Sequence, residues 1–286
     1  MANLKEIRNR ISSVSSTMQI TSAMKMVSAA KLKKAQDAIT AMRPYADKLT
    51  ELLQNLSASL VADTGSTYAD NRPVNKVLIV AITSNRGLCG AFNSNIIKQC
   101  TSLREDTFAG KQVDYVTIGK RGNDLLGKTA TVTANHSDVF DHLSFENVAL
   151  IAEELMELFK DGSYDRIQMV YNKFKNAATQ IVMVEQFLPI VPADGNESSS
   201  TDYIFEPTEA EIVETLIPKS LKTQLYKAVR DSFASEHGAR MTAMHKATDN
   251  ATELRDQLTL TYNQARQAAI TNEILEIVGG AEALSN

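Results

Sequence analysis

Residues 219–284 contain no proline, and their only adjacent glycines are Gly279 and Gly280. This composition predicts one very long helix. At a rise of 1.5 Å per residue, such a helix would extend on the order of 100 Å, several times the width of a compact domain. Intrinsic propensity does not stabilise a helix of that length, so it must lie along a partner for most of its course.

A second helical pattern, from residue 4 to about residue 60, supplies a partner. Residues at alternating steps of four and three form its predicted seam: Ile7, Ile11, Val14, Met18, Thr21, Lys25, Ser28, Leu32, Ala35, Ile39 and Met42. Where this row is polar, the adjacent stripe of Ile20, Met24 and Val27 is expected to face the partner helix instead. The reason is that the residue positions of a straight helix shift gradually relative to a strict seven-residue repeat. Pro44 is expected to bend or interrupt the helix.

The long C-terminal helix carries a seam of its own. Its predicted members are Met241, Met244, Ala247, Ala251, Leu254, Leu258, Thr261, Ala265, Ala268, Asn272 and Leu275. Small residues on such a row let another helix approach closely. Since a separate domain lies between the two helical segments in the chain, we expect them to pair antiparallel as a shaft, with that domain as a head.

The middle of the chain alternates strand-like and helical segments. Residues 77–82 are a continuous apolar run, typical of a buried parallel strand. Further strands are predicted at 113–118, 166–174 and 180–188, the last two antiparallel, and helices at 93–106, 120–126 and 145–160. This alternation indicates an α/β domain. The expected division is residues 1–62 (helix), 73–190 (α/β domain), 191–207 (linker) and 208–286 (helix), with Pro218 kinking the last.

Composition excludes several protein classes. Two cysteines without a CxxC spacing indicate a reducing compartment. The longest apolar run, six residues, is too short to cross a bilayer, and no signal peptide is recognisable. Residues 1–50 carry nine Lys or Arg against three acids, a local +6. That face suits nucleic acid, anionic lipid, an acidic protein surface or plain solvent, and the lack of interleaved aromatic residues weakens the nucleic-acid interpretation.

The sequence offers little enzyme chemistry. The loop at residues 85–93 follows a strand and precedes a helix, but it matches neither GxGxxG nor GxxxxGK[ST], which favours a tight turn over a phosphate site. Cys89 is expected to be a small buried thiol rather than a nucleophile. The histidines His136, His142, His237 and His245 show no metal-binding spacing. We therefore predict no catalytic residue, no cofactor and no metal.

The C-terminal end of the long helix is apolar on a second face. Its residues there are Ile270, Ile274, Ile277, Val278 and Leu284. Two apolar faces require surroundings beyond a single partner helix. The alternatives are a frayed end and insertion into an apolar sleeve formed by other chains, and the pattern favours insertion.

Several stretches resemble the gamma subunits of F-type rotary ATP synthases. They are ITSAMKMVS with AAKLKKAQ at residues 20–36, SNRGLCGAFN at 84–93, RMTAM at 240–244, ATDNA at 247–251, YNQARQAAIT at 262–271 and EIVGGA at 276–281. They extend from one end of the chain to the other. The resemblance implies a Rossmann-like α/β domain, and a helix pair that rotates inside a hexamer of alpha and beta subunits. It implies a non-catalytic chain, because the nucleotide sites lie in the beta subunits.

The resemblance also assigns contact residues. It implies that Arg266 and Gln267, together with the basic residues Lys25, Lys31, Lys33 and Lys34, contact beta subunits. The tip residues Ile270, Ile274, Ile277 and Val278 would lie in the hexamer sleeve. Tyr203, Phe205 and Glu206 would contact the epsilon subunit and the c ring. Gly238, His245, Lys246 and Phe205 depart from the family pattern, so packing at these positions is expected to differ.

Two other functions stay open at this point. The chain could be a nucleotide-binding α/β enzyme with a coiled-coil dimerisation arm, or a basic coiled-coil adaptor for nucleic acid. The resemblance favours the rotary machine, in a bacterium, since no transit peptide is recognisable. The chain would then lie peripherally on the cytoplasmic face of the inner membrane. The coupling ion, proton or sodium, is not determined by the sequence.

Overall fold

The computed structural model describes residues 4–63, 68, 70, 72–190 and 209–285. The chain divides into two compact units, residues 1–28 with 241–286, and residues 29–240. Two long helices, α1 (Leu4–Asp63) and α5 (Glu209–Ser285), contribute to both units. Long terminal helices with a mixed sheet between them in the chain are the fold class expected from the sequence.

The larger unit is built on a five-stranded sheet of order β3-β2-β1-β4-β5. Its strands are β1 (Lys76–Ile82), β2 (Gln112–Ile118), β3 (Val132–Asn135), β4 (Arg166–Phe174) and β5 (Gln180–Leu188). β5 pairs antiparallel with β4, as predicted, and the other pairs are parallel. Strand β3 was not predicted, because this edge strand is only four residues long and none of them is fully buried.

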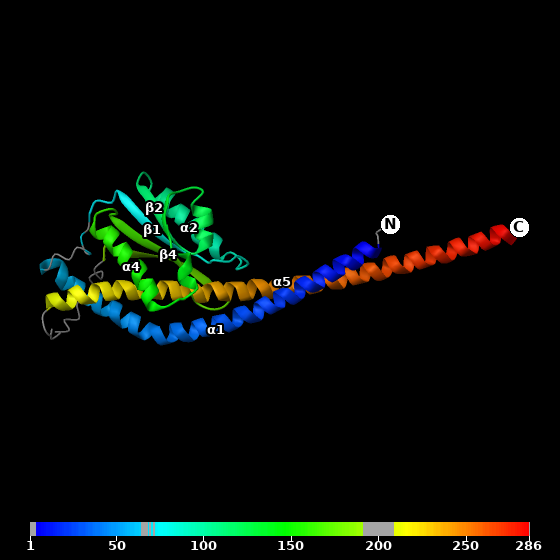
Figure 1. Cartoon of the computed structure of the whole chain (residues 1–286), viewed down its shortest axis with the longest axis horizontal. Helices are drawn as coiled ribbons and strands as arrows, with labels where there is room; N and C mark the ends of the chain where they lie inside the picture. Colours follow the sequence, from blue (N-terminus) through cyan, green and yellow to red (C-terminus); the bar gives the residue numbers. More distant parts are fainter. Residues whose placement is uncertain (1–3, 64–67, 69, 71, 191–208, 286) are drawn as a thin grey trace. The chain divides into compact units, whose positions relative to one another are not determined.

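Shorter helices connect the strands. They are α2 (Phe92–Ser102), a π-helical turn (Leu103–Thr107), α3 (Lys120–Leu126), a 3-10 turn (Ser137–Phe140) and α4 (Phe145–Lys160). Ser144 caps α4, since its hydroxyl oxygen accepts a hydrogen bond from the Asn147 amide at 3.3 Å. Figure 1 shows α2 and α4 on opposite faces of the sheet. Both α1 and α5 continue through their prolines, Pro44 and Pro218, so neither proline ends a helix.

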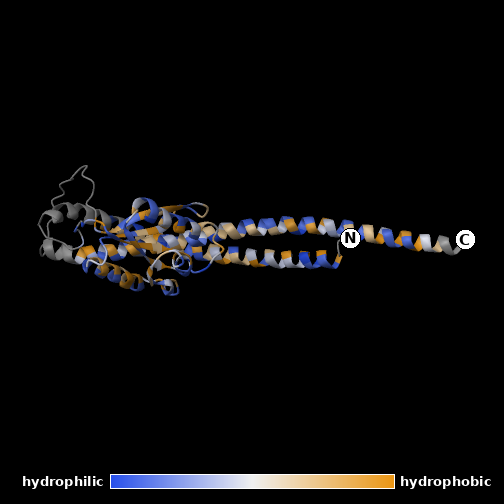
Figure 2. Cartoon of the chain, turned by 90° about the horizontal axis from the view of Figure 1, so that it is seen from above, coloured by the Kyte–Doolittle hydropathy of each residue, from blue (hydrophilic) through white to orange (hydrophobic). Residues whose placement is uncertain are grey.

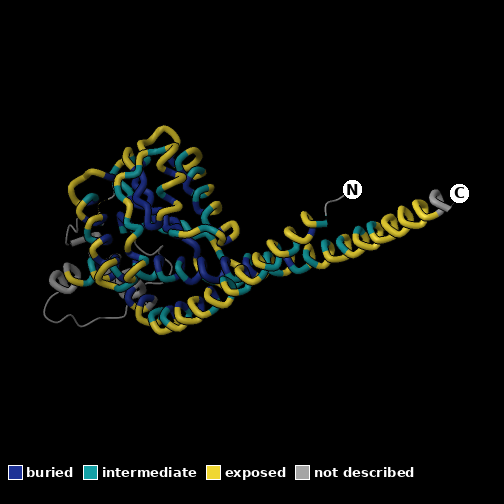
Figure 3. Tube along the Cα trace, turned by 45° about the vertical axis from the view of Figure 1, so that its right-hand side comes forward, coloured by how far each residue is buried: buried dark blue, intermediate teal, exposed yellow. Residues whose placement is uncertain are grey.

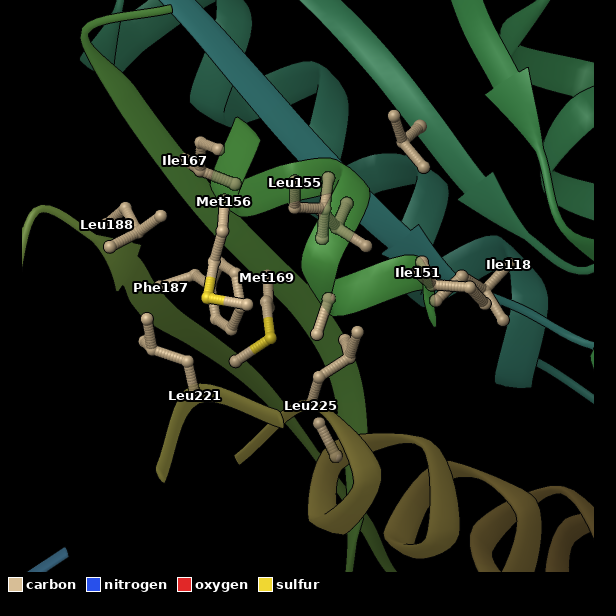
Figure 4. Close-up of a cluster of buried hydrophobic side chains, with 14 of the residues drawn as sticks. Ile118, Ile151, Leu155, Met156, Ile167, Met169, Phe187, Leu188, Leu221 and Leu225 are labelled. Carbon is tan, nitrogen blue, oxygen red and sulfur yellow. The ribbon is translucent and has the colours of Figure 1, made fainter. Parts of the chain in front are cut away.

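Alternate residues of β1 enter two cores. Leu78, Val80 and Ile82 belong to a cluster with α4 and α5, whereas Val77, Ile79 and Ala81 pack with α2 on the other face. Figure 4 shows Leu221 and Leu225 of α5 beside β4, β5 and α4. Burying one such side chain contributes roughly 1.5–3 kcal/mol. The N-terminal part of α5 therefore packs as a layer of the sheet domain.

In the smaller unit, α1 and α5 run antiparallel. Arg8 donates to the Tyr262 hydroxyl at 2.6 Å, the hydroxyl oxygens of Thr21 and Thr248 lie 2.9 Å apart, and Lys25 Nζ lies 3.5 Å from His245 Nδ1. Residue numbers rise along one helix as they fall along the other. Figure 2 shows the two helices side by side over this stretch. The predicted antiparallel pairing is correct.

The predicted seam of α1 is also correct, but the stripe that was expected to replace it is not. Thr21 and Ser28 are buried, whereas Ile20 and Val27 are 60% and 57% exposed. The polar positions stay inside because their hydroxyls are bonded: Thr21 Oγ1 to Met18 O at 3.1 Å, and Ser28 Oγ to Met24 O at 2.8 Å. Because each hydroxyl is hydrogen-bonded, its burial carries little free-energy cost. The helix therefore does not rotate to place the adjacent apolar stripe inside.

The predicted seam of α5 is correct only in part. Met244, Ala251, Leu258 and Ala265 face inward, but Leu254, Thr261, Ala268, Asn272 and Leu275 are exposed. Arg255 and Tyr262 take the inner row instead. Long amphipathic side chains cover the partner helix with their stems and bond polar groups at their ends, as Tyr262 does with Arg8. None of the described helices is long and apolar enough to cross a membrane.

Gly238 allows the β4–β5 hairpin to approach α5. A Cβ at this position would lie 3.2 Å from both Cα and O of Ala177 and 3.5 Å from Phe174 Cε2. Such contacts are tight against backbone atoms, so the hairpin would have to move away. This explains the helix-interior glycine, which costs about 1 kcal/mol relative to alanine.

We therefore expect Gly238→Ala to change the free energy of unfolding by less than ~0.5 kcal/mol, because propensity gain and crowding oppose each other. Gly238→Val should destabilise the chain by about 1–3 kcal/mol. Urea unfolding followed by circular dichroism measures both. Gly279→Val is the control, since a Cβ there meets no described atom within 4 Å; equal costs at the two sites would contradict the packing explanation.

Candidate functional site

Among the described residues of the larger unit, the loop between β1 and α2 is the one that holds a non-glycine residue at a positive φ. Leu88 has a φ of 62°, and Gly90 has a φ of 60°. Glycine adopts this region freely, whereas leucine is rarely found there. The Leu88 side chain is nevertheless 63% exposed, and Arg86 is exposed as well. The loop thus presents a cation and an apolar side chain on a backbone that is unfavourable by itself.

Hydrogen bonds within the loop hold its base. Ser84 Oγ donates to Arg86 O at 2.6 Å, and Asn93 Oδ1 accepts from the Ser84 amide at 3.0 Å. Cys89 is buried in this base, with its Sγ 3.3 Å from Asn93 Nδ2. Burial raises the pKa of the Cys89 thiol, which keeps it protonated and poorly nucleophilic. The interpretation of Cys89 as a buried thiol is confirmed.

Arg240 of α5 clamps the outer part of the same loop. Its Nη2 donates to Arg86 O at 3.0 Å and to Gly87 O at 3.2 Å, and its Nε donates to Gly87 O at 3.3 Å. Its Nη1 donates to Glu236 Oε1 at 2.6 Å. The two side chains are 9% and 10% exposed. A buried charge pair of this kind requires complete hydrogen bonding, and the loop carbonyls supply it.

The charges around this clamp are unbalanced. Burial raises the pKa of Glu236, while the charges of Arg240, Lys31 and Arg86 oppose that rise. Burial and the nearby Arg240 and Lys31 lower the pKa of His237 to about 4. His237 is therefore neutral at physiological pH. One buried carboxylate faces three cations, so the region has excess positive charge.

The clamp lies at the carboxyl end of the parallel strands, near the β1–β4 switch point where open α/β sheets commonly bind ligands. Ser235 Oγ of α5 donates to Asn172 O at 2.9 Å, and Asn172 Nδ2 donates to Phe92 O at 3.2 Å. The loop directs the carbonyl oxygens of residues 86 and 87 to Arg240. Phosphate binding requires N–H groups instead, so this geometry suits a guanidinium and not a nucleotide.

The basic residues singled out by the sequence lie in different units. Lys31, Lys33 and Lys34 are exposed on the part of α1 in the larger unit, and Lys25 is half-buried in the smaller. The Lys25 amine approaches His245, whose Nδ1 is also 3.3 Å from Asp249 Oδ2. His245 thus links the two helices at a position that departs from the family pattern.

The C-terminal end of α5 has no covering from the described residues. Arg266, Gln267 and all residues from 270 to 281 are exposed (Figure 3). The apolar members are 46–67% exposed: Ile270, Ile274, Leu275, Ile277 and Val278. The hydrogen bond between Arg8 of α1 and Tyr262 precedes this end of α5. The remaining predicted contact residues, Tyr203, Phe205 and Glu206, lie outside the described residues.

The burial of Arg240 against the loop at residues 86–87 was not predicted. A Glu and an Arg four residues apart on a helix, as Glu236 and Arg240 are, indicate an ion pair, but nothing local shows that the pair is buried or which carbonyls it meets. Among the described residues, no three His, Cys, Asp or Glu side chains gather as metal ligands.

Leu88→Gly should stabilise the chain. A left-handed conformation costs an L-residue about 1–2 kcal/mol, and the extra backbone freedom of glycine costs about 0.5–1 kcal/mol, so the net gain is ~0.5–1 kcal/mol. Urea unfolding measures it. Leu125→Gly, at an exposed helical position of α3, should destabilise instead. Equal losses at both positions would show that Leu88 is not strained.

His237 should make stability pH-dependent. Its pKa of about 4 in the folded chain is below the unfolded value near 6.5, so the unfolded chain binds the proton first as pH falls. Its contribution is complete above pH 6.5. Between pH 6.5 and 4, the chain should lose about 3 kcal/mol more than a His237→Gln variant. Glu236 is present in the wild type and in the variant, so its opposite effect on the pH dependence of stability cancels in the comparison. The same dependence of unfolding free energy on pH in the two proteins would contradict this prediction.

Comparisons with known proteins agree with this architecture. A family model described as ATP synthase matches residues 3–284. The ATP synthase gamma chain of Flavobacterium johnsoniae is 74% identical over 286 residues, with both chains fully covered, and that of Cytophaga hutchinsonii is 52% identical over 295 residues, also with full coverage.

Solved structures share the fold. A rotor chain of the Euglena gracilis mitochondrial ATP synthase matches with a TM-score of 0.66 and 22% identity, covering 93% of this chain and 98% of that one. A chain from the OSCP/F1/c-ring structure of the same enzyme gives a TM-score of 0.70 and 23% identity, covering 98% and 94%. The chain therefore belongs to the ATP synthase gamma-chain family.

Proposed function

We propose that this chain is the central rotor subunit of an F-type ATP synthase. Its helix pair turns inside a hexamer of alpha and beta subunits and so couples ion flow through the c ring to ATP synthesis or hydrolysis. The chain carries no catalytic residue of that reaction, which takes place in the beta subunits, and it influences their ATPase activity. The observation that carries this proposal is the uncovered apolar end of α5.

That end cannot be explained within the chain. Five large aliphatic side chains between Ile270 and Val278 are exposed on α5, beyond the Arg8–Tyr262 hydrogen bond that joins it to α1. Contiguous exposed apolar surface marks an interaction site. Because these side chains spread over nearly half of the circumference of the helix, they need a broader covering surface than one partner helix offers. A ring of subunits provides such an apolar sleeve.

Polar residues beside this end would contact the same hexamer. Arg266 and Gln267, one turn before Ile270, are exposed and suited to bonding beta-subunit loops. Lys25, Lys31, Lys33 and Lys34 would face acidic beta-subunit surfaces. Exposed charges of one sign guide such encounters more than they tighten them.

The remaining assignments complete the proposal. The α/β domain at residues 73–190 would lie outside the hexamer, and residues 191–207, with Tyr203, Phe205 and Glu206, would contact the epsilon subunit and the c ring. The helical parts would be residues 1–62 and 208–286. The chain would lie on the cytoplasmic face of a bacterial inner membrane, held there by the c ring. The coupling ion is a proton or sodium.

Reconstitution tests the proposal. The full chain is mixed with alpha and beta subunits, and the complex is analysed for stoichiometry, ATPase activity and rotation. We expect a complex of three alpha, three beta and one copy of this chain, whose rotation requires the chain. Full activity and rotation without it would refute the rotor role. Calorimetry of the chain with ATP, ADP and NAD tests the enzyme alternative, which requires micromolar binding.

Charge reversal at Lys33 and Lys34 should lower coupling more than assembly. Exposed ion pairs contribute only about 0–1 kcal/mol each, too little to hold the complex together. Ion pumping per ATP hydrolysed, measured with the holoenzyme in sealed vesicles, reports coupling, and gel filtration measures assembly. The matched control reverses Lys98 and Lys111, which are exposed elsewhere in the larger unit. Lost assembly with normal coupling in the surviving complexes would contradict the assignment.

A further inference from the structure

We infer that Arg240 is a positioning residue, which fixes the strained loop tip at residues 86–88 to α5 so that tip and helix move as one body. This inference rests on the proposed rotor function, in which force passes between α5 and the surfaces that the chain presents. The inference gives a function to the buried pair of Arg240 and Glu236. Neither residue is among the predicted contact residues.

The geometry of the bonds favours a guanidinium. Three of the N–H groups of Arg240 reach two consecutive carbonyls, Arg86 O and Gly87 O, at 3.0–3.3 Å. A fourth binds Glu236, one turn earlier on the same helix, at 2.6 Å. The planar fork of arginine is held from both sides, which a lysine ammonium on a flexible stem cannot reproduce. Glu236 thus aims Arg240, and Arg240 holds the loop.

The tip needs such a restraint. A leucine at φ 62° persists only where its surroundings over-determine the backbone, and positions of this kind cluster at functional surfaces. The bonds of Ser84 and Asn93 hold the base of the loop. Arg240 acts beyond that base, on the carbonyl of Gly87, the residue immediately before Leu88.

The side chains carried by the tip explain why its position matters. Arg86 and Leu88 are exposed and carry the charge and the apolar surface of the loop. Neither contributes to the core, so the strain is not offset by burial of these side chains.

The test compares Arg240→Lys and Arg240→Gln with a matched control, Arg230→Lys. Arg230 also lies on α5, and it donates to a carbonyl of the same unit, Leu143 O, at 3.2 Å, but it does not touch the loop. Hydrogen exchange of residues 84–91 is measured in the purified full chain. Ion pumping per ATP hydrolysed is measured with the holoenzyme, c ring included, in sealed vesicles, and gel filtration of the complex with alpha and beta subunits verifies assembly.

We expect loop exchange to accelerate roughly tenfold or more in Arg240→Gln, and less in Arg240→Lys, because hydrogen bonds to a charged donor are lost. Coupling should fall in the same order while ATPase activity and assembly persist. Arg230→Lys should leave both readouts unchanged. Wild-type exchange in Arg240→Gln, or equal acceleration in the Arg230 variant, would overturn the inference.

The two readouts separate this inference from the rotor proposal. Loop exchange is measured on the chain alone, so it tests the positioning role even if no complex forms. Failure of the wild-type chain to assemble would refute the rotor function only. Faster loop exchange with wild-type coupling would show that Arg240 holds the tip but that the tip plays no part in force transfer, which would also overturn the inference.

Discussion

The burial of one face of α5 against the sheet is the interaction on which the larger unit depends. Ile217, Leu221, Leu225 and Val229 join the core formed by α4 and the sheet. Apolar burial of this kind supplies most of the favourable free energy of folding. Since the same helix continues for more than forty residues past this core, the sheet domain fixes one end of a very long element.

Burial along α5 then changes in three steps, each with its own physical cause. From Leu216 to Arg240 the helix is packed in the larger unit, and nearly every side chain is buried or half-buried. From Met241 to about Ala269 only one face is covered, by α1, and beyond residue 270 every described side chain is exposed (Figure 3). A helix of constant geometry therefore serves as core layer, as half of a pair and as a surface for other chains.

The boundary between the first two steps carries the densest polar network. Glu236, His237 and Arg240 are buried there together, and the carbonyls of residues 86 and 87 complete the hydrogen bonding of Arg240, whereas His237 Nε2 has no partner among the described atoms. Buried charges are costly unless every group is satisfied. The same requirement that keeps Arg240 bonded also keeps Leu88 in a conformation that leucine avoids, so local strain and global packing are linked.

The expectations that failed share a cause. The α1 stripe at Ile20 and Val27 and the α5 position at Leu254 were expected inside because they are apolar. Thr21 and Tyr262 lie inside instead, since their polar groups find partners across the helix pair, Thr248 and Arg8. Hydrophobicity alone cannot identify such positions, because these partners across the helix pair lie more than two hundred positions away in the sequence.

Periodicity and composition by themselves determined the two long helices, four of the five strands and the antiparallel pairing, because these follow from local patterns of apolar residues. They also determined the apolar end of α5. Only the tertiary structure decided which polar residues enter the helix pair, why Gly238 occurs inside a helix and which carbonyls Arg240 binds. Each of these depends on backbone atoms that meet only after the chain has folded.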